Sequence, residues 1–187
     1  MTMKAHQMIL ATAILAFSGD VSLAARTVHR SAVKAQGSHA AASGYYVEFL
    51  ARPSQYFGHS YVQVGRIDRA ATARTTATVG FYPKSVKSVF DAPGTVTATP
   101  SDLRATPSVR YRVAVSERTF RKTVALVNKL PDTWQRYDLV GRNCNHLVGR
   151  IARQIGLGDP GGYADLPENY VRSMRAANGG RTRASWR

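Results

Sequence analysis

The clearest pattern along the chain is a set of short stretches in which apolar and polar residues alternate. In residues 109–115, valine and tyrosine at the odd positions alternate with arginine and alanine at the even positions. Alternation with a period of two is typical of a β-strand that buries one face. We therefore expect strands over residues 45–51, 59–65, 76–83 and 109–115.

Three other stretches repeat apolar residues every three or four positions, which predicts helices. Ser116 can cap a helix over 117–130, which Pro131 should end. A second helix should begin at or near Cys144 and end near Gly156, and a third should span 167–177. Within residues 85–107 we expect a turn at 91–94, then a short strand, then a second turn at 100–102. The predicted fold class is α+β, with a small antiparallel sheet packed against the helix that begins near Cys144.

The two ends of the chain lack these periods. Residues 1–24 combine an early lysine, an apolar run and a small-x-small sequence ending at Ala24, which predicts a secretory signal peptide. Residues 25–43 are predicted to be a disordered spacer and residues 178–187 a flexible basic tail. One domain over 44–177 remains. We expect a secreted or periplasmic protein with no membrane span after the leader is removed, and an uncleaved anchor is the alternative.

The charge of the chain limits its partners. The 187 residues carry a formal net charge of +15 at pH 7. A positive field of this size favours polyanions, such as anionic envelope polymers, phospholipid surfaces or nucleic acid. Because the arginines are scattered and no nucleic-acid-binding module is evident, we expect no nucleic-acid partner. An envelope-facing surface is the preferred interpretation, and a charge that only keeps the protein soluble is the alternative.

Cys144 is the only cysteine of the chain and stands where the second helix should begin. Free N–H groups and the dipole at a helix N-terminus stabilise an anion, and can lower a cysteine pKa from about 8.5 to between about 3.5 and 7.5. The same N–H groups could hold an oxyanion. A small buried apolar side chain is the alternative interpretation. The polar neighbours Asn143, Asn145 and His146, and the lack of a second cysteine, favour a reactive thiol.

A cysteine nucleophile needs a base, which is usually a histidine that is distant in sequence. His59 follows Gly58 at the predicted start of a strand and is our candidate. If the two residues form a dyad, their side chains should approach within about 4 Å.

These two segments together carry a resemblance. Gly58-His59-Ser60 at the start of a strand, and later Asn143-Cys144-Asn145-His146 at the start of a helix, resemble the circularly permuted branch of the papain-like fold. That branch includes permuted NlpC-like hydrolases, lecithin:retinol acyltransferase-like proteins and PPPDE thiol peptidases. The resemblance covers residues 45–158. It implies a permuted papain-like domain in which Cys144 is the nucleophile and His59 the base.

The family usually has a third polar residue, on the strand after the histidine strand, that orients the imidazole. Residues 76–83 contain no His, Asp, Glu or Gln. The orienting or oxyanion residue therefore stays open among Asn143, Gln63, Thr78 and Glu48. Candidates for lining a substrate groove are Tyr61, Tyr82, Tyr137 and His146.

The sequence thus predicts an exported thiol hydrolase that needs no cofactor and no metal, since no cluster of Cys and His has zinc-ligand spacing. The resemblance implies an amide or ester substrate. A peptidoglycan stem peptide is the first expectation, and a lipid or lipoprotein acyl group the second. The alternative is a catalytically weak papain-like module that binds anionic envelope components.

Overall fold

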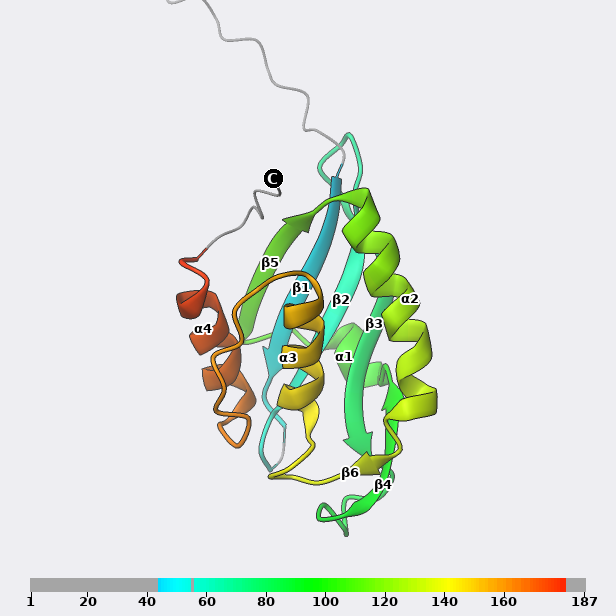
Figure 1. The fold of residues 1–187 in the computed structure, drawn as a ribbon, viewed down its shortest axis with the longest axis vertical. Helices are drawn as coiled ribbons and strands as arrows, with labels where there is room; N and C mark the ends of the chain where they lie inside the picture. The colour runs from blue at the N-terminus through cyan, green and yellow to red at the C-terminus, as the bar shows by residue number, and fades with distance from the viewer. Residues whose placement is uncertain (1–43, 55, 181–187) are drawn as a thin grey trace, which may run out of the picture. The chain divides into compact units, whose positions relative to one another are not determined.

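The computed structural model describes residues 44–54 and 56–180, which form a mixed α+β fold around one antiparallel sheet (Figure 1). The sheet has six strands in the order β5-β1-β2-β3-β4-β6. Strand β2 lies between β1 and β3, so it is central rather than an edge. The strands are β1 (Gly44–Arg52), β2 (His59–Ile67), β3 (Ala73–Pro83), β4 (Ala92–Thr97), β5 (Val109–Val115) and β6 (Arg136–Tyr137).

Four helices accompany the sheet in this part of the chain. Helices α2 (Glu117–Thr133), α3 (Cys144–Gln154) and α4 (Pro167–Ala177) lie on one face, and the short helix α1 (Pro100–Arg104) lies on the other (Figure 1). We call these the three-helix face and the α1 face.

The pleat of the strands divides the side chains between the two faces. On β1 and β2, Val47, Phe49, Val62 and Val64 are fully buried and pack with residues of α2, α3 and α4 in one apolar core. Their alternate neighbours point to the α1 face, where Glu48 is buried and pairs with Arg110 and Arg112, and where Tyr46, Leu50 and Tyr61 are buried as well. Burial of apolar area on the three-helix face is the main favourable contribution to folding.

The predicted elements are confirmed with small shifts in their ends, and so is the α+β class. Four corrections are needed, the first of which is β6, a strand in a stretch for which no element was predicted. Residues 100–104, expected as a turn, form α1, because Thr99 and Asp102 make a reciprocal capping box. Strand β4 begins at Ala92, inside the turn expected there. Helix α2 continues past Pro131 to Thr133.

The predicted signal peptide (1–24), the spacer (25–43) and residues 181–187 of the predicted tail lie outside the described residues. Within the described ranges, none of the helices has the length and apolar character needed to span a membrane.

Candidate functional site

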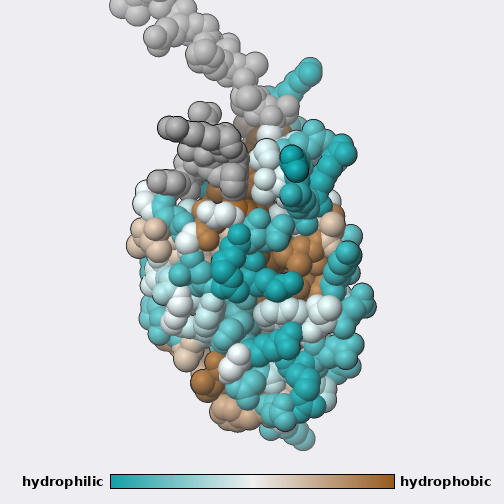
Figure 2. All heavy atoms as spheres, in the orientation of Figure 1, coloured by the Kyte–Doolittle hydropathy of each residue, from teal (hydrophilic) through white to brown (hydrophobic). Residues whose placement is uncertain are grey.

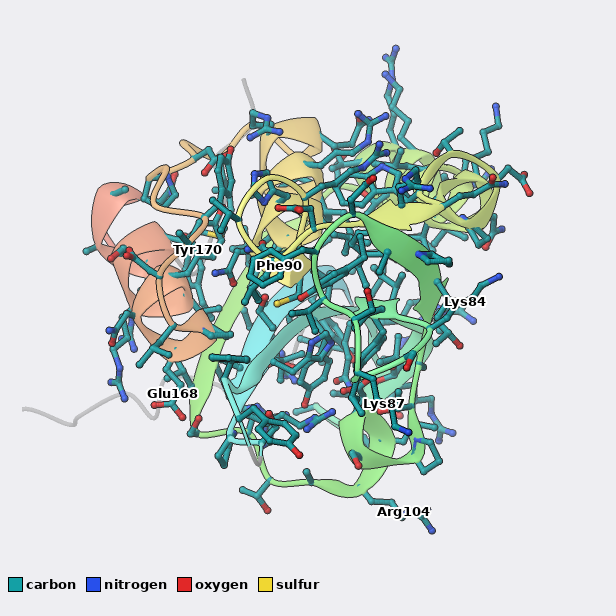
Figure 3. All side chains as sticks on the ribbon, turned by 90° about the horizontal axis from the view of Figure 1, so that it is seen from below. Lys84, Lys87, Phe90, Arg104, Glu168 and Tyr170 are labelled. Carbon is teal, nitrogen blue, oxygen red and sulfur yellow. The ribbon has the colours of Figure 1, made fainter. Side chains whose placement is uncertain are left out.

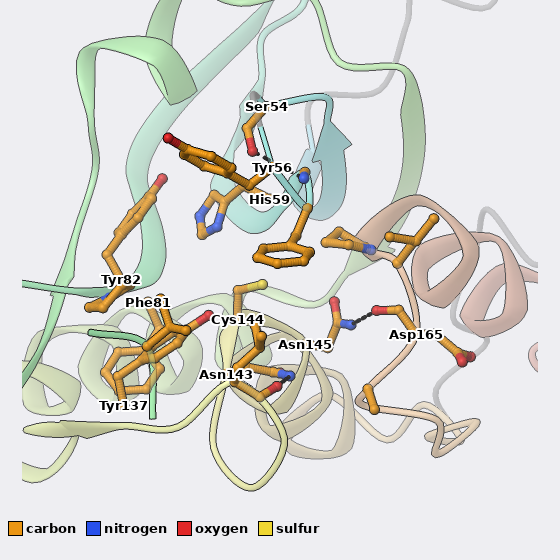
Figure 4. A pocket seen from close by; sticks show the side chains of 18 of the residues that line it. Ser54, Tyr56, His59, Phe81, Tyr82, Tyr137, Asn143, Cys144, Asn145 and Asp165 are labelled. Atoms are coloured by element: carbon orange, nitrogen blue, oxygen red, sulfur yellow. Dashed lines mark hydrogen bonds between the residues drawn. The ribbon is translucent and has the colours of Figure 1, made fainter. Parts of the chain in front are cut away.

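A cavity of about 520 Å³ opens at the end of the sheet where β2 begins (Figure 4). Its walls come from the turn before β2, the end of β3 with the loop after it, the loop before α3 and the loop before α4. Most of the lining side chains are apolar. Both Cys144 and His59 line it, so the structure brings the two predicted catalytic residues to one cavity.

Cys144 is the first residue of α3, as predicted. Asn143 caps the helix: its Oδ1 accepts from the His146 N–H at 3.2 Å, and its Nδ2 donates to the carbonyls of Leu139 and Tyr163 at 2.6 and 2.8 Å. These bonds fix the first turn of α3, and the sulfur of Cys144 points into the cavity (Figure 4).

The thiol is buried, and burial raises the pKa of Cys144 above its ordinary value. This is opposite to the lowering expected at a helix N-terminus. The Ser60 hydroxyl and the backbone N–H groups of Ser60, Asn145 and Cys144 act in the other direction, because they can donate to a thiolate. In the structure the one proton of the Ser60 hydroxyl is instead donated to Asn145 Oδ1 at 2.8 Å, which ties the start of β2 to α3.

His59 lies on the α1 face of the sheet. Its ring is parallel to that of Tyr61, two residues along β2, and stacks on Tyr82 of β3 with the ring centroids 4.0 Å apart. Gly80 leaves the space that the imidazole occupies, since a Cβ there would lie 2.4 Å from His59 Nε2. That Nε2 is buried and has no hydrogen-bond partner. Burial lowers the pKa of His59 to about 3, so the imidazole is neutral at pH 7.

The buried ion pair of Arg52 and Asp102 lies close to the His59 ring. Arg52 Nε donates to Asp102 Oδ1 at 2.9 Å, and the Tyr82 hydroxyl donates to Asp102 Oδ2, which also accepts from the Thr99 N–H at 2.9 Å. Burial raises the pKa of Asp102, but hydrogen bonds from Tyr82, the Thr99 N–H and Arg52 together outweigh it and hold this pKa below its usual value. The negative charge of Asp102 in turn favours the protonated form of His59.

His59 and Cys144 therefore approach the cavity from opposite faces of the sheet. The helix-facing neighbour in β2 is Ser60, whereas His59 turns toward α1. No hydrogen bond joins His59 Nε2 to the sulfur. The predicted dyad contact within about 4 Å stays a prediction, as do the two catalytic roles.

The other predicted residues are placed as follows. Asn143, Tyr82 and Tyr137 line the cavity, whereas Tyr61 and His146 do not. Tyr61 is buried behind His59, and His146 stacks on Tyr163 with centroids 4.0 Å apart. Glu48, Gln63 and Thr78 form one row across β1, β2 and β3, beyond the cavity, and Glu48 is bound by Arg110 and Arg112.

Sequence reasoning missed Ser60, Asn145, Arg52 and Asp102. Asn145 and Ser60 are sequence neighbours of Cys144 and His59, but their bond depends on how α3 packs on β2. The capping-box spacing of Thr99 and Asp102 was a signal for α1, although not for the ion pair with Arg52. Among the described residues, no group of three or more His, Cys, Asp or Glu side chains is placed to hold a metal ion.

In comparison with known proteins, no family model, no curated protein and no solved structure matches the chain.

Proposed function

We propose that this protein is an exported cysteine hydrolase of permuted papain-like fold, which cleaves an ester or amide bond with Cys144 as nucleophile and His59 as base. One observation carries the proposal. The single thiol sits at the N-terminus of α3, inside a cavity that also holds an unpartnered histidine nitrogen. Perturbed titratable groups that share a cavity are typical of catalytic sites.

The chemistry follows from the groups around the sulfur. His59 removes the thiol proton, and the thiolate attacks the substrate carbonyl carbon to give a tetrahedral oxyanion. The N–H groups at the start of α3 and of β2 can stabilise negative charge there. Collapse expels the alcohol or amine, which takes the proton from His59, and water then hydrolyses the thioester.

His59 must turn away from Tyr82 for this step, because its resting position is on the α1 face. Neutral His59 and protonated Cys144 fit a resting state in which the ion pair is not formed. Catalytic hydrogen bonds are often long in unliganded enzymes and tighten when the substrate binds.

The cavity walls favour an acyl substrate over a peptidoglycan stem peptide. Phe57, Val86, Leu139 and Val140 are among the lining residues, and a stem peptide carries several charges. Burying such charges among apolar side chains costs free energy, whereas an acyl chain gains from it. We therefore place an ester or thioester of a fatty acyl group first and an amide second.

Two observations favour a second function, a binding module without catalysis. The raised pKa of Cys144 and the missing hydrogen bond to His59 describe an unreactive thiol at rest.

The decisive experiment compares hydrolysis of p-nitrophenyl laurate and p-nitrophenyl acetate by the wild type, Cys144→Ala, His59→Ala and a matched control, His146→Gln. We expect faster turnover of the longer ester, a thioester on Cys144 detectable by mass spectrometry, no turnover in Cys144→Ala, and a loss of about 10²- to 10⁴-fold in His59→Ala. His146→Gln should retain most activity because His146 lies outside the cavity lining. Turnover that persists in Cys144→Ala, or its absence from the wild type, would reject the hydrolase and leave the binding module.

A further inference from the structure

Large apolar side chains are exposed around the mouth of the cavity. Seven such residues in the described part of the chain have more than half of their surface exposed, and six of them lie in the loops at this end of the sheet. We call these six the apolar rim: Tyr56, Phe57, Val86, Phe90, Val140 and Leu166. Leu103, on α1, is the seventh and lies outside the cavity lining.

The rim is assembled from four separate segments. Tyr56 and Phe57 precede β2, Val86 and Phe90 follow β3, Val140 precedes α3 and Leu166 precedes α4. Figure 3, which looks at this end, shows Phe90 near the middle of it. In Figure 2 apolar atoms are also visible at the lower end of the molecule. Five of the six rim residues, all but Phe90, also line the cavity. Scattered exposed apolar residues need no explanation, but a set gathered around a cavity marks an interaction surface.

Charge identifies the kind of partner. Lys84 and Lys87 lie in the loop that carries Val86, on one side of this end (Figure 3), and neither makes an ion pair with a described residue. Two acids of these loops are already engaged: Asp91 pairs with Arg136, and Asp138 accepts from the N–H groups of Val140 and Gly141. The apolar rim thus lies beside a loop whose two lysines make no ion pair with a described residue, while Asp165 lies beside Leu166.

We propose that the apolar rim docks on an anionic lipid bilayer, with the rim side chains entering the interface and Lys84 and Lys87 contacting lipid phosphates. Apolar and aromatic side chains flanked by lysine suit a membrane interface. A protein partner fits less well, because lysine is depleted in protein–protein interfaces. Docking would hold the cavity mouth against the surface. It goes beyond the proposed hydrolysis and does not require the thiol to react.

The single cysteine allows a site-specific test in a Cys144→Ala background, in which hydrolysis is absent. An environment-sensitive fluorophore is attached to the full chain at Val86→Cys or, as the matched control, at Leu103→Cys. Vesicles contain phosphatidylcholine alone or with phosphatidylglycerol. We expect a blue shift at position 86 with phosphatidylglycerol vesicles and none at position 103. A label at 86 that stays in water, or equal shifts at both positions, would overturn the proposal.

Binding constants from vesicle sedimentation give a second measure. Each of Lys84→Glu and Lys87→Glu should weaken binding to phosphatidylglycerol vesicles about fivefold or more, and added salt should weaken it further. Val86→Asp/Val140→Asp should weaken it by about tenfold or more, whereas Leu103→Asp should not. Both apolar variants replace exposed residues, so folding can be checked by circular dichroism. If the label at position 86 is instead shielded from water in a dimer that forms without lipid, the apolar rim is a protein interface.

Discussion

The two faces of the sheet are built on different interactions. The three-helix face buries almost only apolar side chains, whereas the α1 face buries three ions, Glu48, Arg52 and Asp102, beside residues such as Leu50 and Tyr61. Each of these ions has a charged partner: Arg52 and Asp102 bind one another, and Glu48 binds two arginines of β5. Apolar contacts are non-directional, so one apolar side chain can be replaced by another of similar size. A buried ion, in contrast, depends on one specific partner. The cavity lies where the two kinds of packing meet.

The largest effect that this comparison predicts is at Asp102. Asp102→Ala leaves Arg52 buried without its carboxylate, and we expect a loss of about 3–5 kcal/mol in the free energy of unfolding by urea. The surface control Glu117→Gln, which removes the exposed pair with Arg121 on α2, should cost only about 0.2–0.5 kcal/mol. Arg52→Met/Asp102→Asn should lose less than Asp102→Ala, because no charge stays unpaired. Equal losses of stability in Asp102→Ala and Glu117→Gln would contradict the expectation that the buried ion pair depends on its partner more than the exposed pair does.

A smaller loss of stability is predicted at Gly80, where β3 leaves space for the His59 imidazole. Gly80→Ala would place a Cβ 2.4 Å from His59 Nε2, so the ring must move. We expect a loss of about 1–3 kcal/mol in stability, measured by urea unfolding. Gly141→Ala is the control, because its new Cβ would meet its nearest neighbour, Asp138 Oδ1, at 3.4 Å.

His59→Ala should remove most of the penalty of Gly80→Ala in a double-mutant cycle. Additive losses would show that the ring is not what the new methyl group displaces.

The smallest predicted effect is a slope of stability against pH. The pKa of His59 falls from 6.5 to about 3 on folding, so between these values the unfolded chain binds more protons than the folded one. Stability should therefore fall as the pH is lowered below 6.5, by at most about 1.4 kcal/mol per pH unit. His146, half-buried, has a lowered pKa and adds a contribution of the same sign.

Urea unfolding at pH values from about 6.5 down to about 4.5 stays mostly above the range in which carboxylates titrate. His59→Gln should flatten the slope there, and His146→Gln should flatten it less. An unchanged slope in His59→Gln would mean that His59 binds protons equally in the folded and unfolded states, so that folding does not lower its pKa.

The elements that sequence reasoning found are those with a long period or a clear cap. Strand β2 and helix α3 carry several turns or alternations of apolar residues, and α4 begins at a proline. Helix α1 has five residues, too few to show a period. The Arg52–Asp102 pair joins residues 50 positions apart, so it follows only from how β1 and α1 are placed in the fold.

The face of the sheet on which His59 lies could be predicted from the sequence. Val62 and Val64 are the apolar residues of β2, so even-numbered positions should face the helices and odd-numbered positions should face away. Ser60 therefore belongs with the helix face and His59 with the other, as the structure has them. The expectation of a direct contact between His59 and Cys144 rests on the kinds of residue alone and stays a prediction. The hydroxyl–amide bond between Ser60 and Asn145 could not be foreseen, because it needs the packing of α3 on β2.

The pairing register of β2 has a consequence for how this site can change. Arg52 pairs with His59 and Ala51 with Ser60 across β1. A slip of β2 by one residue would present His59 to α3, but it would also turn Val62 and Val64 out of the core, which makes the slip unfavourable. A shift of the β2 backbone is therefore not a way to bring His59 to the Cys144 sulfur. The His59 side chain can therefore approach Cys144 only by rotating around the end of β2. His59 is the first residue of this strand, so no earlier strand residue blocks the rotation.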